Sequence, residues 1–115
     1  MAYRVEISQG AIREIDRFFV RLRDFSLATA EKYELALQRT IDQYLVEKPT
    51  FFPPYPEVGA PYYRFLFRVT PRTAYWIVYR VYEAQGVVRL LQFRSTSQEE
   101  TVIEFFGLEK WMEEE

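Results

Sequence analysis

The chain has 115 residues, a formal net charge of −2 and 18% aromatic residues, which supports one domain around a single hydrophobic core and argues against a broad phosphate-binding surface. It contains no cysteine and no histidine, so disulfides, thiolate ligands, the commonest zinc ligand and the usual general base are excluded. The sequence therefore predicts a single domain, residues 1–115, without a metal or cofactor, in which any acid–base chemistry depends on Arg, Lys, Tyr or carboxylates.

The amino-terminal residues predict a strand at the edge of a sheet. Residues 3–7 (Tyr-Arg-Val-Glu-Ile) alternate apolar and polar side chains, as a half-buried strand does. The start of the chain has no apolar run of signal-peptide or membrane-spanning length. We therefore expect a cytoplasmic protein without a membrane partner.

Two amphipathic helices follow this strand. Ser8 has the chemistry of a helix N-cap, and apolar residues at helical spacing after it predict a first helix at about residues 9–24. A second apolar stripe predicts a helix at about residues 28–47, which Pro49 terminates. Because the joint between them is short, we expect an antiparallel helix hairpin whose apolar side covers a sheet.

A proline-rich segment connects the second helix to the next strand. Residues 49–61 hold five of the six prolines, interleaved with Phe51, Phe52 and Tyr55. We interpret this segment as an ordered connecting loop. A polyproline ligand for another domain is the less favoured interpretation, because Pro-Pro-Tyr-Pro lies between a helix and a strand of a small compact fold.

Three strands are predicted at residues 62–69, 74–82 and 87–94, and the short turns between them indicate an antiparallel meander. We expect three-residue loops at both turns, with Gly86 in the left-handed region of the second. The resulting register pairs are Tyr63 with Val81, Phe65 with Tyr79, Phe67 with Ile77, Arg64 with Arg80, Glu83 with Val87, Val81 with Arg89, and Trp76 with Arg94.

This register makes one face of the meander nearly all apolar, and that face is expected to pack on the helix hairpin. The opposite face carries arginines that face one another, which is unfavourable by some tenths to about 1 kcal/mol unless an anionic partner lies between them. We therefore expect this face to bind a partner. Its residues are Arg64, Leu66, Arg68, Trp76, Val78, Arg80, Leu90, Gln92 and Arg94, and all except Gln92 are candidate partner-binding residues.

The carboxyl-terminal part, residues 97–115, predicts a further helix with an acidic tail. Ser97-Gln98-Glu99-Glu100 matches a capping box, and an apolar stripe follows it. The predicted fold class is therefore α+β in the order β-α-α-β-β-β: a helix hairpin on an antiparallel three-stranded meander, with the amino-terminal strand at an edge and a carboxyl-terminal helix.

This order of elements resembles the RelE/ParE superfamily of toxins from type II toxin-antitoxin modules, over about residues 3–98. Arg64 matches the arginine that the superfamily carries on its first meander strand. The other residues that carry the resemblance are Tyr3 to Ser8, Ala11, Ile15, Tyr33, Leu37, Ile41, Leu45, Pro49, the strand from Tyr75 to Val81, and the Val-x-x-Leu-Leu pattern from Val87 to Leu91.

The resemblance is closer to the ParE branch, whose members poison DNA gyrase by binding. RelE-like members cleave messenger RNA in the ribosome with lysines, arginines and often a carboxyl-terminal tyrosine, whereas this chain has no lysine between Lys48 and Lys110 and no tyrosine after Tyr82. The resemblance thus implies a gyrase inhibitor of a plasmid-stabilisation-like module, not an enzyme. It also implies an antitoxin, in a possible hetero-oligomer, that covers apolar surface around Leu66, Trp76, Val78 and Leu90.

Two alternatives remain open. In a RelE-like ribonuclease acting on messenger RNA in the ribosome, arginines would hold the scissile phosphate and a tyrosine would move the proton. In a non-toxic protein of the same fold, acidic side chains of the carboxyl-terminal helix would neutralise the arginines. The catalytic candidates for the first alternative are Arg64, Arg80, Arg94 and Tyr82, with Tyr62 as the other nearby phenol.

Overall fold

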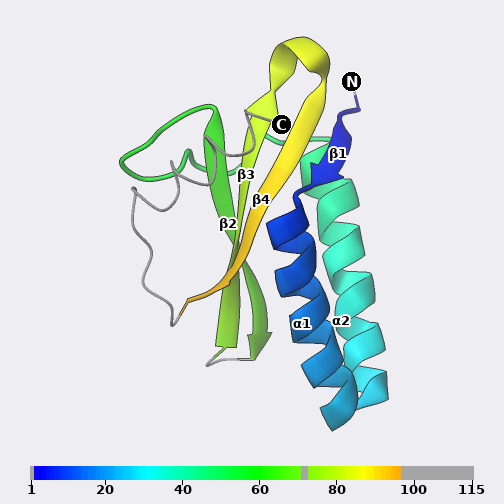
Figure 1. The fold of residues 1–115 in the computed structure, drawn as a ribbon. Helices are drawn as coiled ribbons and strands as arrows, with labels where there is room; N and C mark the ends of the chain where they lie inside the picture. The colour runs from blue at the N-terminus through cyan, green and yellow to red at the C-terminus, as the bar shows by residue number, and fades with distance from the viewer. Residues whose placement is uncertain (1, 71–72, 97–115) are drawn as a thin grey trace.

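The computed structural model describes residues 2–70 and 73–96, and it confirms the predicted β-α-α-β-β-β order (Figure 1). The predicted carboxyl-terminal helix and acidic tail lie outside the described residues. In the part of the chain that the structure describes, no helix is long and apolar enough to cross a membrane. The elements are β1 (Arg4–Ile7), α1 (Gln9–Phe25), α2 (Leu27–Thr40), the π-helix η1 (Ile41–Val46), β2 (Tyr62–Thr70), β3 (Thr73–Tyr82), the 3₁₀ turn η2 (Glu83–Gln85) and β4 (Val87–Ser95).

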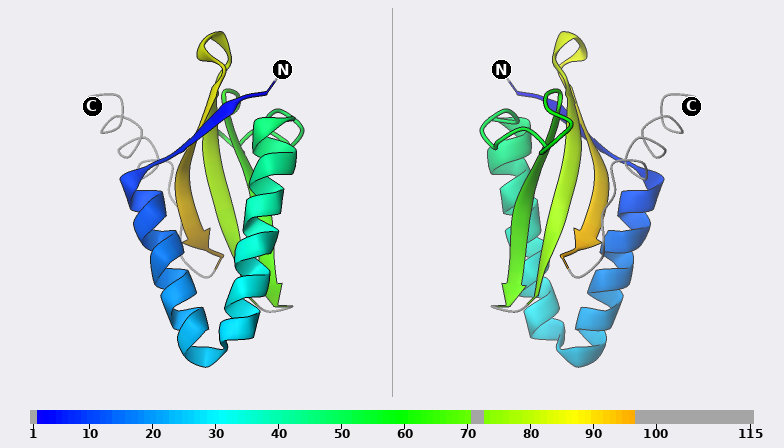
Figure 2. Two further views of the ribbon diagram at one scale, coloured as in Figure 1. Left: turned by 90° about the vertical axis from the view of Figure 1, so that its right-hand side faces the viewer. Right: turned by 90° about the vertical axis from the view of Figure 1, so that its left-hand side faces the viewer.

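The four strands form one sheet in the order β1-β4-β3-β2. β2, β3 and β4 pair antiparallel as predicted, and β1 lies at the edge beside β4, to which it runs parallel. α1 and α2 lie on one face of this sheet; they meet at their joint and diverge towards β1 (Figure 2). The opposite face of β2, β3 and β4 points away from both helices.

Two serines determine where the helices begin. Ser8 has extended backbone dihedrals, and its hydroxyl oxygen accepts a hydrogen bond from the Ala11 N–H at 3.1 Å, which satisfies one of the free donors at the start of α1. Ser26 ends α1 and caps α2 through the Thr29 N–H at 3.2 Å. The hairpin joint is therefore a single residue, shorter than predicted.

The second helix extends almost as far as predicted, but its end is not α-helical. After Thr40 the chain continues as the π-helix η1, a change that the apolar stripe did not predict. The carbonyl of Val46, at the end of η1, accepts a hydrogen bond of 2.8 Å from the N–H of Tyr3. This hydrogen bond connects the end of the π-helix to the residue that precedes β1.

The core lies between the helices and the sheet, as the apolar face predicts. Tyr79 is fully buried in it, and its hydroxyl donates a 2.7 Å hydrogen bond to the Pro49 carbonyl. Burial, followed by the nearby Tyr63, raises the pKa of Tyr79 above its ordinary value of 10.0. This helix-side cluster includes Phe18, Phe19, Leu37, Ile41, Leu45, Tyr63, Phe65, Phe67, Ile77, Tyr79, Val81, Val88, Leu90 and Phe93.

The register between β2 and β3 differs from the prediction by two residues. Phe65 pairs with Ile77, not Tyr79, and Arg64 pairs with Val78, not Arg80. Two features cause the difference: Thr70 pairs with Thr73, so the turn is one residue shorter than predicted, and the register shifts by one further residue between Arg68 and Thr70. Since side chains alternate with a period of two, a two-residue shift keeps every side chain on its predicted face. The predicted pairs are wrong, but the faces of β2 and β3 are correct.

The register between β3 and β4 is correct at one end only. Gly86 has a φ of 64° as predicted, and Trp76 pairs with Arg94, but Arg89 pairs with Arg80 instead of Val81. A bulge causes the change, because Val78 pairs with Gln92 while Tyr79 pairs with Leu90.

Leu91 is the extra residue of this bulge. Because of the bulge, Leu90 and Leu91 each lie on the face of the sheet that was predicted for the other. Leu90 is fully buried in the helix-side cluster, so its predicted place on the arginine-bearing face is wrong. Leu91 occupies that face instead, packed with Val78.

Candidate functional site

The side of β2, β3 and β4 that points away from the helices carries a set of arginines. We call it the arginine face: Arg64 and Arg68 on β2, Arg80 on β3, and Arg89 and Arg94 on β4. Alternation puts these side chains opposite the apolar residues of the helix-side cluster. The structure thus brings together the arginines predicted for this face and adds Arg89 to them.

Arg64 lies against two aromatic rings. Its guanidinium carbon is 3.9 Å from the centre of the Trp76 ring and 5.1 Å from the centre of the Tyr55 ring. Such cation–π contacts are worth about 0.5–2 kcal/mol each, depending on burial. Because the guanidinium lies over both rings, these contacts hold the Arg64 side chain in place on the face.

Tyr55 reaches Arg64 because the proline-rich loop is folded against the start of β2. The Tyr55 N–H donates to the Tyr62 carbonyl at 2.8 Å, and Pro54 forms an antiparallel bridge with Tyr63. The Tyr55 carbonyl accepts from the Gly59 N–H at 2.8 Å, where a φ of 78° suits glycine. The ordered loop predicted for this segment is confirmed.

Arg80 has a similar environment further along the sheet. Its guanidinium carbon is 4.4 Å from the centre of the Tyr82 ring and 5.3 Å from that of the Tyr62 ring, and its Nη1 donates to the Tyr62 hydroxyl at 3.3 Å. Tyr62 is the direct partner of Arg80 across β2 and β3, and Arg89 is its direct partner on β4. The rings of Tyr62 and Tyr82 therefore help to hold the Arg80 side chain beside Arg89, which has the same charge.

A small apolar cluster packs between the arginine side chains of this face. Tyr55, Val78 and Leu91 are buried in it, with Trp76 and Tyr62 packed against them. Val78 has no exposed surface, so it supports the face without offering surface to a partner. The predicted partner-binding residues that retain exposed surface on this face are Arg64, Leu66, Arg68, Trp76, Arg80 and Arg94.

The chemistry of this face favours binding anionic groups over general acid–base catalysis. Guanidinium groups stay charged and present several N–H donors that match carboxylates and phosphates. β2, β3 and β4 contain no lysine, and the chain has no histidine. Among the described residues, no group of acidic side chains could hold a metal ion.

A pocket lies beside the arginine face where the proline-rich loop diverges from β2. Its volume is about 520 Å³. Prolines of the loop and the strand residues Arg64 and Leu66 line it, so the pocket is mostly apolar with one cation among its lining residues. We call it the loop pocket. Its lining residues are Phe52, Pro53, Pro54, Pro56, Arg64, Phe65, Leu66 and Trp76.

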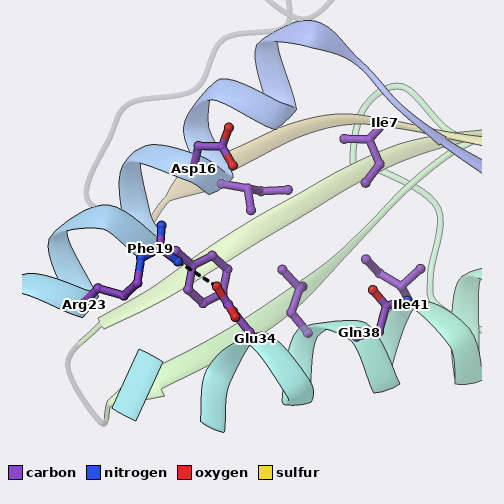
Figure 3. A pocket seen from close by; sticks show the side chains of 9 residues that line it. Ile7, Asp16, Phe19, Arg23, Glu34, Gln38 and Ile41 are labelled. Atoms are coloured by element: carbon purple, nitrogen blue, oxygen red, sulfur yellow. Dashed lines mark hydrogen bonds and ion pairs between the residues drawn. The ribbon is translucent and has the colours of Figure 1, made fainter. Parts of the chain in front are cut away.

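A groove on the helix side of the sheet lies between α1 and α2 (Figure 3). Its volume is about 330 Å³, and apolar side chains such as Phe19 and Ile41 line it. Arg23 of α1 and Glu34 of α2 form an ion pair of 2.8 Å across one end. Both side chains are about half exposed, so solvent screening leaves this pair a small contribution to stability, at most about 1 kcal/mol.

The sequence did not predict three residues at the arginine face: Arg89 and Leu91 of β4, and Tyr55 of the loop, which contacts Arg64. Leu90-Leu91 interrupts the alternation of β4, and this interruption was the available sign of a bulge that also moves Arg89. Tyr55 had a weaker sign, as an aromatic residue flanked by prolines. Its contact with Arg64 depends on how the loop folds, which spacing along the chain does not encode.

A helix hairpin on one face of a β1-β4-β3-β2 sheet, with arginines on the other face, defines this chain as a toxin domain of the RelE/ParE superfamily. The model of a family described as "ParE toxin of type II toxin-antitoxin system, parDE" matches residues 5–100. The chain therefore belongs to this ParE toxin family, which implies an antitoxin partner. No curated protein matches its sequence.

Proposed function

We propose that this toxin binds DNA gyrase through the arginine face and thereby blocks supercoiling. Membership of the ParE toxin family carries the proposal. The rings around Arg64 and Arg80 support it, because cations already held in place lose little freedom when they bind acidic groups of a partner. Binding energy at protein interfaces concentrates in such arginine and aromatic residues.

We further propose that a cognate antitoxin neutralises the toxin by covering the same face. Leu66 and Trp76 offer it apolar surface beside the arginines, while Val78 and Leu90 are buried and act only through packing. The toxin would act in the cytoplasm as part of a plasmid-stabilisation module. Antitoxin and gyrase would then compete for one surface.

A supercoiling assay with purified gyrase tests the gyrase proposal. We expect the wild-type chain to inhibit supercoiling and Arg64→Ala to inhibit at least ~10-fold less strongly, a loss of about 1.4 kcal/mol. Arg64→Lys should also weaken inhibition, because lysine keeps the charge but not the guanidinium that lies over the Trp76 ring. Arg13→Ala, which removes an exposed arginine of α1, is the matched control and should inhibit like the wild type. Full supercoiling in the presence of the wild-type chain would refute the proposal.

A ribosome-dependent ribonuclease is the second candidate, and the contact between Arg80 and the Tyr62 hydroxyl favours it. A guanidinium 3.3 Å from a phenol oxygen could hold a phosphate beside a proton donor. Cleavage of messenger RNA on programmed ribosomes, abolished by Tyr62→Phe and reduced by Arg80→Lys, would establish this function. Intact messenger RNA together with loss of supercoiling would exclude it.

A further inference from the structure

A further pocket lies on the helix side of the sheet, at the end where β2 begins and β3 ends. Its volume is about 400 Å³, and its lining residues are Ala60, Pro61, Tyr63, Val81 and Glu83. Tyr63 and Val81 belong to the helix-side cluster, so the pocket lies on the side of the sheet opposite the arginine face. We call it the Glu83 pocket.

The fold holds the segments that line this pocket in place. The Val81 N–H donates to the Pro61 carbonyl at 3.0 Å, which attaches the end of the proline-rich loop to β3. The Tyr63 ring stacks on the buried ring of Tyr79, with 5.6 Å between the ring centres. Glu83 is the first residue of η2 and directly follows β3. A ligand therefore finds most of the site already formed.

The polar side chains of this pocket favour a positive charge. Within the described residues, neither the Glu83 carboxylate nor the Tyr63 hydroxyl takes part in a hydrogen bond or an ion pair. Burial raises the pKa of Tyr63 above its ordinary value of 10.0, and Glu83 and then Tyr3 raise it further. A carboxylate that disfavours a phenolate at this position favours a cation there.

The lining also determines which kind of cation fits. Among the described residues, no group of three or more side chains could hold a metal ion, and the pocket supplies one carboxylate, whereas calcium and magnesium need several oxygen ligands. Tyr63 and Val81 are buried, and Pro61 adds half-buried apolar surface. A ligand that suits this lining has an apolar chain and a cationic end, as a lysine side chain does.

We propose that the Glu83 pocket binds a primary alkylammonium group, presented by a lysine side chain of another protein. The methylene groups pack on Pro61 and Val81, and the ammonium donates hydrogen bonds to the Glu83 carboxylate and the Tyr63 hydroxyl. The toxin then has binding sites of opposite charge on opposite sides of its sheet. The site does not depend on gyrase being the target.

Titration of the full ¹⁵N-labelled chain with n-butylammonium chloride, at constant chloride concentration, tests the site by NMR. We expect saturable shifts of the amide signals of Ala60, Val81 and Glu83, with half-saturation at about 1–10 mM for a ligand of this size. 1-Butanol, which has a similar shape without the charge, should bind at least 5-fold more weakly. Shifts that do not saturate, or equal binding of butanol, would overturn the proposal.

Two variants that remove the same charge separate the pocket from general attraction to an acidic protein. Glu83→Gln keeps the size of the side chain and should weaken butylammonium binding at least 5-fold. Glu31→Gln, which removes an exposed carboxylate of α2, is the matched control and should weaken it less than 2-fold. Equal effects of the two substitutions would contradict a site at Glu83.

Two further ligands distinguish a lysine side chain from a free amine. The peptide acetyl-Gly-Lys-Gly-amide should bind within about 3-fold of butylammonium, because only the side chain enters the pocket. Putrescine, a free diamine, should bind no more than about 3-fold more tightly than the peptide. Binding of putrescine at least 10-fold more tightly than the peptide would overturn the lysine side chain as the ligand and assign the pocket to a free polyamine.

Discussion

Tyr79 links the core of the sheet to the start of the proline-rich loop. Its hydroxyl donates to the Pro49 carbonyl at 2.7 Å, and the side chain is fully buried. Tyr79→Phe removes the hydroxyl and leaves the buried Pro49 carbonyl without this hydrogen-bond donor. We therefore expect a loss of about 1–2 kcal/mol in the free energy of unfolding. Urea denaturation measures this loss. Unchanged stability would mean that water replaces the hydroxyl.

The same residue makes stability depend on alkaline pH. Burial raises the pKa of Tyr79 above 10.0, so above about pH 10 the unfolded chain loses this proton while the folded chain keeps it. The contribution of the protonated Tyr79 side chain to the free energy of unfolding is complete below the ordinary pKa. It is lost as pH rises towards the pKa of the folded state, with a slope of at most about 1.4 kcal/mol per pH unit. The stability difference between wild type and Tyr79→Phe should therefore shrink from pH 9 to pH 11. A constant difference would contradict the raised pKa.

At the scale of elements, Ser8 joins the start of α1 to the bulge in β4. Its hydroxyl accepts from the Ala11 N–H and also donates to the carbonyl of Leu91, the extra residue of the bulge, at 3.1 Å. Ser8→Ala loses both interactions, so we expect a cost of about 1–3 kcal/mol. The Ser26 hydroxyl is half-buried and makes only its cap hydrogen bond among the residues that the structure describes, so Ser26→Ala should cost about 1 kcal/mol and is the matched comparison. Equal costs in urea denaturation would show that the bond to Leu91 contributes nothing.

The elements were predictable where local periodicity decides them. Ser8, the two helical stripes and the alternation along β2 and β3 predict the hairpin and both faces of those strands. Periodicity offered one sign of the bulge, the interruption at Leu90-Leu91, but it did not predict the hydrogen bond between Ser8 and Leu91, which lie far apart along the chain. The π-helix was likewise missed, since its last carbonyl bonds to Tyr3. Both departures depend on contacts that sequence spacing does not contain.

At the scale of the whole molecule, the arginine face was predicted as a surface but not in its internal arrangement. Alternation alone places Arg64, Arg68 and Arg80 on the side away from the helices. Whether a given arginine faces another arginine or an aromatic ring depends on turn length and on the bulge, which also set the pairing of Arg80 with Arg89. The alternation of side chains along a strand therefore predicts which residues share a surface. The contacts between those residues can be predicted only when the register between the strands is known.

The contrast between a net charge of −2 and a face of arginines predicts how the molecule selects its target. A protein that neutralises many phosphates loses about 10³–10⁵ in affinity between about 50 and 200 mM salt. If the target is an acidic protein surface, fewer cations are involved, and we expect the affinity of the labelled chain for gyrase to fall less than ~10-fold over that range. Excess linear DNA should not compete, because long-range repulsion opposes the approach of a negatively charged molecule to DNA. A steep salt dependence together with competition by DNA would instead mean that the arginine face binds nucleic acid.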